Sequence, residues 1–120
     1  MARPKKNNAD YFSHDAGMRN HIKMKAVRRK FGIEGYAIWC MILEHLTSSD
    51  FFIGSYSELD LELMSGDFEV EPSKLKEILE YFAAIELLVV NDNEFYSESL
   101  NNRFEPLLTK RERDRNGVSA

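Results

Sequence analysis

The sequence predicts a mainly helical domain that also carries a small β-hairpin, an α+β fold. Apolar residues recur at spacings of three and four in several segments, which is the pattern of amphipathic helices. Near the C-terminal end, two short apolar runs flank Asn91-Asp92-Asn93, and both residue types favour tight turns because they tolerate a positive φ. These patterns predict helices along most of the chain and one hairpin late in it.

The first helix is expected at residues 21–31. Met24, Val27 and Phe31 lie at positions i, i+3 and i+7, on one face of such a helix. Gly32 follows directly, and glycine is the residue best suited to end a helix in a left-handed conformation. Lys25, Arg28 and Arg29 fall on the side opposite the apolar stripe.

The second helix is expected at residues 33–47. Its segment 36–43 is apolar on every side, which is typical of a helix that is buried on every side. Trp39 should therefore be among the best-buried residues. Gly35, close to the start of this helix, indicates a position where another backbone approaches closely.

A short strand is expected at residues 51–53, because this apolar run lies between polar and glycine residues. Ser57 then precedes Asp60 by three positions, the spacing of a capping box that starts a helix. The apolar face of this short helix is expected to consist of Leu59, Leu63 and Met64.

The next helix should begin at Pro72, since proline suits the first helical position. Leu75, Ile78, Leu79 and Phe82 follow at i, i+3, i+4 and i+7, the cleanest amphipathic pattern in the chain. The hairpin comes next, with strands at residues 87–90 and 94–97.

A last amphipathic helix is expected at residues 100–108, although Pro106 disturbs it. The predicted organisation is a flexible basic arm at residues 1–9, a winged-helix domain at residues 10–108 and a charged, disordered tail at residues 109–120. The winged helix is predicted from the element order. The two helices after the first strand have the layout of a helix-turn-helix, and the hairpin follows where a wing would lie.

Three short motifs resemble a known family. They are Tyr-Phe-Ser-His-Asp at 11–15, Phe-Gly-Ile-Glu-Gly-Tyr at 31–36 and Phe-Tyr-Ser at 95–97. Together they resemble the N-terminal domain of phage replisome-organiser proteins, which are related to DnaD-like primosome components, over residues 10–104. The resemblance implies a winged-helix fold, a role in replication initiation or helicase loading in phages or mobile elements, and self-association through this domain. In such families, DNA affinity often resides in, or is shared with, a C-terminal region.

The sequence predicts no enzyme, no metal site and no cofactor. Ser13-His14-Asp15 contains the residue types of a hydrolytic triad, but adjacent residues cannot converge as a triad requires, and Ser13 and Asp15 are good helix caps. Cys40 and the three histidines lack the spacing of a zinc site, and no glycine-rich phosphate loop is present. A single cysteine and the lack of a long apolar stretch predict a cytoplasmic protein.

The charge is strongly asymmetric along the chain. Residues 1–30 carry nine Lys/Arg against two Asp, whereas residues 31–100 carry two Lys against fifteen Asp/Glu. Residues 101–120 carry five Lys/Arg against three Asp/Glu. Such a division indicates either an electrostatic binding surface at one end of the domain, for a phosphate backbone or an acidic protein, or basic ends that only balance the acidic body.

One hypothesis is DNA binding. The second helix of a helix-turn-helix, here residues 72–82, would enter the major groove, but its two lysines lie beside Glu77 and Glu80, and the hairpin turn at 91–94 is acidic. Phosphate contacts should therefore come mainly from the arm and the first helix. The candidate nucleic-acid-binding residues are Arg3, Lys5, Lys6, Arg19, Lys23, Lys25, Arg28, Arg29, Lys30, Lys74 and Lys76.

The other hypothesis, favoured for this domain, is protein–protein assembly. The acidic body of one copy would meet the basic end of another, with an exposed Tyr81 or Tyr96 as an anchor. The expected partners are a second copy of this chain or other replisome proteins, with DNA as the alternative. Neither a membrane nor a small-molecule substrate is expected.

Overall fold

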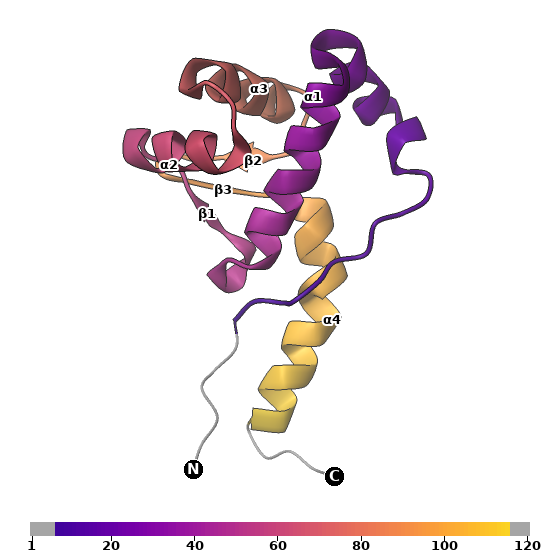
Figure 1. Ribbon diagram of the computed structural model, residues 1–120. Helices are drawn as coiled ribbons and strands as arrows, with labels where there is room; N and C mark the ends of the chain where they lie inside the picture. The colour runs from indigo at the N-terminus through magenta and orange to yellow at the C-terminus, as the bar shows by residue number, and fades with distance from the viewer. Residues whose placement is uncertain (1–6, 116–120) are drawn as a thin grey trace.

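The computed structural model describes residues 7–115, and Figure 1 shows the arrangement of its elements. A 3-10 turn, η1 (Met18–Asn20), precedes the long helix α1 (Ile22–Thr47). A second 3-10 turn, η2 (Asp50–Phe52), and strand β1 (Gly54–Ser55) lead into helices α2 (Glu58–Phe68) and α3 (Pro72–Ala84). The hairpin strands β2 (Val89–Val90) and β3 (Glu94–Tyr96) are followed by α4 (Glu98–Arg115).

The three strands form one antiparallel sheet in the order β1-β3-β2. Phe95 of the central strand pairs with Gly54 on one side and with Val90 on the other. Helix, strand, two helices and a hairpin in this order, with β3 in the middle, make a winged helix. The predicted fold class, mainly helical with a small sheet, is confirmed.

The two helices predicted on either side of Gly32 form one element with a break at that residue. Gly32 has φ 70° and ψ −156°, a conformation open to glycine and strained for other residues. Beyond the break, a Cβ added at Gly35 would lie 2.7 Å from Cβ of Phe31 and 2.8 Å from Cγ1 of Val27. The close approach predicted at Gly35 is therefore present. Both side chains and the backbone carbonyl of Val27, at 3.3 Å, make it, and all belong to the preceding segment of α1.

The hydrophobic core contains most of the apolar residues that the helical spacing assigned to it in α1 and α3. Leu75, Ile78, Leu79 and Phe82 of α3 are fully buried, as predicted. Trp39 of α1 is 5% exposed and meets Phe82 edge to face, with 5.3 Å between the ring centroids. Since each helix contributes a buried ring, this contact packs α1 against α3.

The strand predicted at residues 51–53 is wrong. Residues 50–52 form η2 instead, and the strand is confined to residues 54–55. Phe51 and Phe52 both have positive φ, 55° and 59°, which no continuous strand allows. This turn buries Phe52 against the ring of Phe104, with 4.3 Å between centroids, and leaves Phe51 exposed.

The apolar face predicted for α2 is also wrong in part. The capping box of Ser57 and Asp60 is present, and Met64 is buried, but Leu59 and Leu63 are 62% and 64% exposed. The buried side of α2 is set by the spacing i, i+3, i+4 and i+7 from Leu61. That stripe consists of Leu61, Met64, Ser65 and Phe68.

The N-terminal segment and α4 lie against each other (Figure 1). Arg103 donates to the carbonyl of Ser13 at 2.8 Å and pairs with Asp15, and Arg111 donates to the carbonyl of Asn8 at 2.7 Å. These contacts attach α4 to the N-terminal segment. The helix continues through Pro106 to Arg115, beyond the domain end expected at residue 108.

Residues 7–9, which the sequence places in the flexible arm, are packed against the domain. The backbone N–H of Ala9 donates to the carbonyl of Thr47 at 3.0 Å, and Ala9 is buried. The rest of the predicted arm (1–6) and the end of the predicted tail (116–120) lie outside the described residues. Among residues 7–115, no helix has the length and apolar content needed to cross a membrane.

Candidate binding surfaces

The first surface is the one that a winged helix normally presents to DNA, and here it is acidic. We call it the α3–hairpin surface. Its exposed residues are Ser73, Lys76, Glu77 and Glu80 of α3, and Asn91, Asp92, Asn93 and Glu94 of the hairpin. The exposed charged residues of these two elements are thus one lysine and four carboxylates. Burial, and secondarily the negative charge of Glu80, raise the pKa of the Tyr56 hydroxyl.

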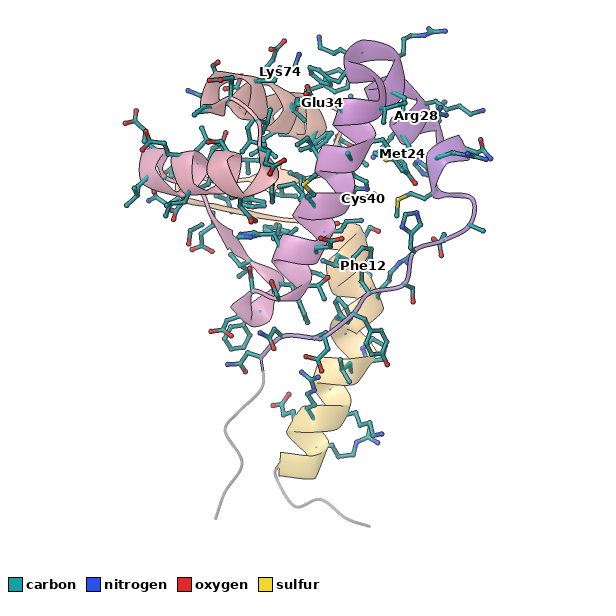
Figure 2. The ribbon with its side chains drawn as sticks, viewed as in Figure 1. Phe12, Met24, Arg28, Glu34, Cys40 and Lys74 are labelled. Atoms are coloured by element: carbon teal, nitrogen blue, oxygen red, sulfur yellow. The ribbon has the colours of Figure 1, made fainter. Side chains whose placement is uncertain are left out.

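Lys74, the other lysine of α3, lies against aromatic rings at the contact between α1 and α3. Its Nζ lies 5.4 Å from the ring centroid of Phe31 in α1, and its side chain is half-buried (Figure 2). Phe31 in turn meets Tyr81 edge to face at 5.5 Å, and Nζ of Lys30 lies 5.0 Å from the Tyr81 ring. Both lysines therefore make cation–π contacts that hold the first segment of α1 against α3.

The second surface is the basic α1 face, on η1 and the first segment of α1. From Gly17 to Ile33 the chain carries six cations and no acidic residue. Arg19, Lys25, Arg29 and Lys30 are exposed.

The other two cations of this segment are half-buried and bonded to backbone. Lys23 donates to the carbonyl of Glu86 at 3.2 Å. Arg28, labelled in Figure 2, donates to the carbonyl of Arg19 at 2.9 Å. Of the candidate nucleic-acid-binding residues, the structure brings Lys25, Arg29 and Lys30 together around one hollow and leaves Arg19 and Lys76 exposed elsewhere. Arg3, Lys5 and Lys6 lie outside the described residues.

A shallow hollow lies beside the basic α1 face, between α1 and α3. Its lining residues are Ile22, Lys25, Ala26, Arg29, Lys30 and Tyr81. Ile22 is 79% exposed, and Tyr81 is half-buried. The hollow therefore has apolar walls and cationic edges, a combination that suits an apolar side chain flanked by carboxylates.

The third surface is on α2, and sequence reasoning missed it. Leu59, Glu62, Leu63 and Gly66 are all exposed and lie at i, i+3, i+4 and i+7, on one side of the helix; we call this the leucine face. Glu58 lies beside it and is also exposed. The signal that could have found this face is the alternative stripe from Leu61 to Phe68. Once that stripe is assigned to the core, Leu59 and Leu63 must point outward.

Comparison with known proteins identifies the domain. Residues 11–100 match the family model described as Lin1244/Lin1753-like, N-terminal. The chain belongs to this family. No curated protein and no solved structure matches it significantly. The matched range begins at the Tyr-Phe-Ser-His-Asp motif and ends within α4, so it contains the whole winged helix.

The polar residues of the Tyr-Phe-Ser-His-Asp motif have separate partners in this Lin1244/Lin1753-like domain. Nε2 of His14 lies 3.0 Å from the hydroxyl of Tyr36, whereas Asp15 pairs with Arg103. The carbonyl of Ser13 accepts from the same arginine. These interactions tie the motif to α1 and α4, and they do not bring Ser13, His14 and Asp15 together as a triad.

The two groups with displaced pKa values in the helical body are half-buried side chains of α1. Burial raises the pKa of the Cys40 thiol, and the nearby Glu44 carboxylate raises it further. Burial lowers the pKa of His45, although Asp67 and Asp60 act in the opposite direction. His45 stacks on Phe95 with 6.1 Å between centroids. Within residues 7–115 no three metal-ligating side chains come together.

Proposed function

We propose that this domain is a non-catalytic winged-helix module that acts by binding other proteins during assembly, in replication initiation or mobile-element biology. The single observation that carries the proposal is the charge of the α3–hairpin surface. The replication and mobile-element context comes from the motifs at residues 11–15, 31–36 and 95–97, which resemble phage replisome-organiser proteins.

The α3–hairpin surface is poorly suited to a DNA groove. Glu77, Glu80, Asp92 and Glu94 would face a phosphate backbone, and a protein gains affinity for DNA by neutralising phosphates with cations. Lys76 alone cannot offset four carboxylates. A partner protein with basic residues would instead be attracted to this surface.

A second candidate function is binding to the DNA backbone through the basic α1 face. The observation that favours it is that Arg19, Lys25, Arg29 and Lys30 are all exposed, with no acidic residue between Gly17 and Ile33. If all four contacted phosphates, the logarithm of the binding constant would change with the logarithm of salt concentration with a slope of about −3 to −4.

Fluorescence anisotropy with a labelled duplex tests both candidates, at about 50 and about 200 mM salt. The proposed function predicts that Lys76→Glu leaves duplex binding unchanged at either salt concentration. Binding that falls in Lys25→Glu/Arg29→Glu and has the slope given above would support the second candidate. Duplex binding that Lys76→Glu weakens, and Lys25→Glu/Arg29→Glu does not, would contradict the proposed function.

A further inference from the structure

The leucine face of α2 and the hollow beside the basic α1 face have complementary chemistry. We propose that they bind each other between two copies of this chain, head to tail. The proposal rests on the proposed function in protein binding, and it names the partner and the two surfaces.

The leucine face presents apolar side chains surrounded by negative charge. Leu59 and Leu63 are 62% and 64% exposed, one helical turn apart. Glu58 and Glu62 stand beside them, and no cation lies within α2. At Gly66, the end of the face, an added Cβ would meet no atom within 4 Å, so nothing obstructs an approaching helix there.

The hollow presents the opposite charge with a matching apolar floor. Ile22 is exposed, and Ala26 contributes a small side chain to a lining that also contains Lys25, Arg29 and Lys30. The ring of Tyr81 forms the wall contributed by α3. The leucines of a partner would contact Ile22 and Tyr81, while the partner's carboxylates would face Lys25 and Arg29.

The two surfaces also agree in length. The residues Ile22, Lys25, Ala26 and Arg29 repeat the spacing of Leu59, Glu62, Leu63 and Gly66. Each set therefore extends about 10 Å along its helix at the rise of an α-helix. Glu62 lies between the leucines along its helix, just as Lys25 lies between Ile22 and Arg29.

A second copy of this chain suits the hollow better than a DNA duplex does. A phosphate backbone offers no apolar partner for Ile22, and a bound duplex would leave Leu59 and Leu63 exposed. A second copy covers both apolar sets and pairs both sets of charges.

In Figure 1, α2 and the first segment of α1 lie at different sides of the molecule, with α3 between them. Each bound copy therefore keeps one surface free, so the assembly grows or closes into a ring.

The association should be weak and sensitive to salt. Two helix faces of this length bury less than a standard interface of about 1,600 Å², so we expect a Kd in the high micromolar range. The charges that face each other are exposed, and salt weakens the attraction between exposed charges. The Debye length, about 10 Å at 0.1 M, shortens as salt is added.

Analytical ultracentrifugation of the full chain at increasing concentration tests the proposal. One variant, Lys25→Glu/Arg29→Glu, reverses the charge of the hollow. The other, Leu59→Ser/Leu63→Ser, removes the leucines but keeps Glu58 and Glu62. Both change exposed side chains, and circular dichroism checks that they fold. The matched control is Lys110→Glu/Arg113→Glu, which makes the same charge change at exposed positions of α4.

The proposal predicts that the average mass of the wild-type chain rises with concentration and falls when salt is added. Each variant alone should remain monomeric, and the control should behave as the wild type does. An equimolar mixture of the two variants should stop at a 1:1 dimer, because each supplies the one surface that the other lacks.

A wild-type chain that stays monomeric at millimolar concentration would overturn the proposal, as would variants that assemble like the wild type. A mixture in which both variants stay monomeric would also overturn it. None of these outcomes bears on duplex binding through the α3–hairpin surface, so failure of this proposal is distinguishable from failure of the proposed function.

Discussion

Replacing Gly54 with alanine should destabilise the domain strongly, because Gly54 faces an aromatic ring across the sheet. Gly54 pairs with Phe95, and an added Cβ would lie 2.4 Å from both Cε1 and Cζ of that ring. Phe95 is fully buried and cannot easily retreat. Its ring stacks on His45 at an interplanar angle of 10° and meets Tyr56 edge to face.

The size of the effect follows from this overlap. Forcing extra atoms into a packed core typically costs about 1–3 kcal/mol, and here the Cβ overlaps two ring atoms that neighbouring rings hold in place. We therefore expect a loss of about 3 kcal/mol for Gly54→Ala, at the upper end of that range. In a chain of 120 residues, with an unfolding entropy of about 2.1 cal/mol/K per residue, such a loss lowers the Tm by roughly 12 °C.

Urea unfolding followed by the fluorescence of Trp39, the single tryptophan, measures the loss directly. Gly66→Ala is the control, since an added Cβ there meets no atom within 4 Å and alanine favours a helix by about 1 kcal/mol over glycine. In a Phe95→Leu background, Gly54→Ala should cost much less. The steric reasoning is refuted if Gly54→Ala costs under about 1 kcal/mol, or costs the same in both backgrounds.

Three further predictions concern helix ends and pH. Ser57→Ala removes the capping box with Asp60 and should lower the free energy of unfolding by about 1 kcal/mol in urea titrations; an unchanged midpoint would contradict the role of the cap. Gly32→Ala should cost about 1–3 kcal/mol, because φ 70° and ψ −156° strain a residue that has a Cβ, and a neutral effect would show that the break does not need glycine. Burial lowers the pKa of His45 in the folded state, so the unfolded chain binds the proton more tightly. The free energy of unfolding should therefore fall as pH drops through the unfolded pKa of about 6.5 and level off below the folded one. His45→Gln should flatten this part of the pH profile, and an unchanged profile would exclude His45 as its source.

The spacing of apolar residues predicted a helix correctly where only one of its faces is apolar. The stripe from Leu75 to Phe82 has charged residues on its other side, so only one face could turn inward. Gly32 was placed correctly at a helix break because its conformational freedom is a local property. The turn residues 91–93 predicted the hairpin correctly, although none of them adopts the positive φ on which that prediction was based.

Periodicity could not decide where two stripes compete. In α2, the set from Leu59 and the set from Leu61 both have helical spacing, and Ser65 made the correct one look less apolar. Ser65 is tolerated in the core because its hydroxyl donates to the carbonyl of Glu62 at 2.7 Å. The leucine face was therefore assigned to the interior, although the structure exposes it.

Contacts between distant segments were also beyond sequence reasoning. The packing of α4 against the N-terminal segment depends on hydrogen bonds from Arg103 and Arg111 to backbone carbonyls about ninety or more positions away. Likewise, two of the six cations from Arg19 to Lys30 are bonded to backbone carbonyls, which the charge pattern alone does not reveal.

Amide NMR of the labelled domain during titration with a duplex, at about 0.15 M salt, shows whether the α3–hairpin surface contacts DNA. Resonances of residues 72–84 and 89–96 should stay in place as the duplex is added. Resonances of α3 and the hairpin that shift together in one saturating step would contradict this expectation, because the duplex would then occupy the surface that carries the four carboxylates.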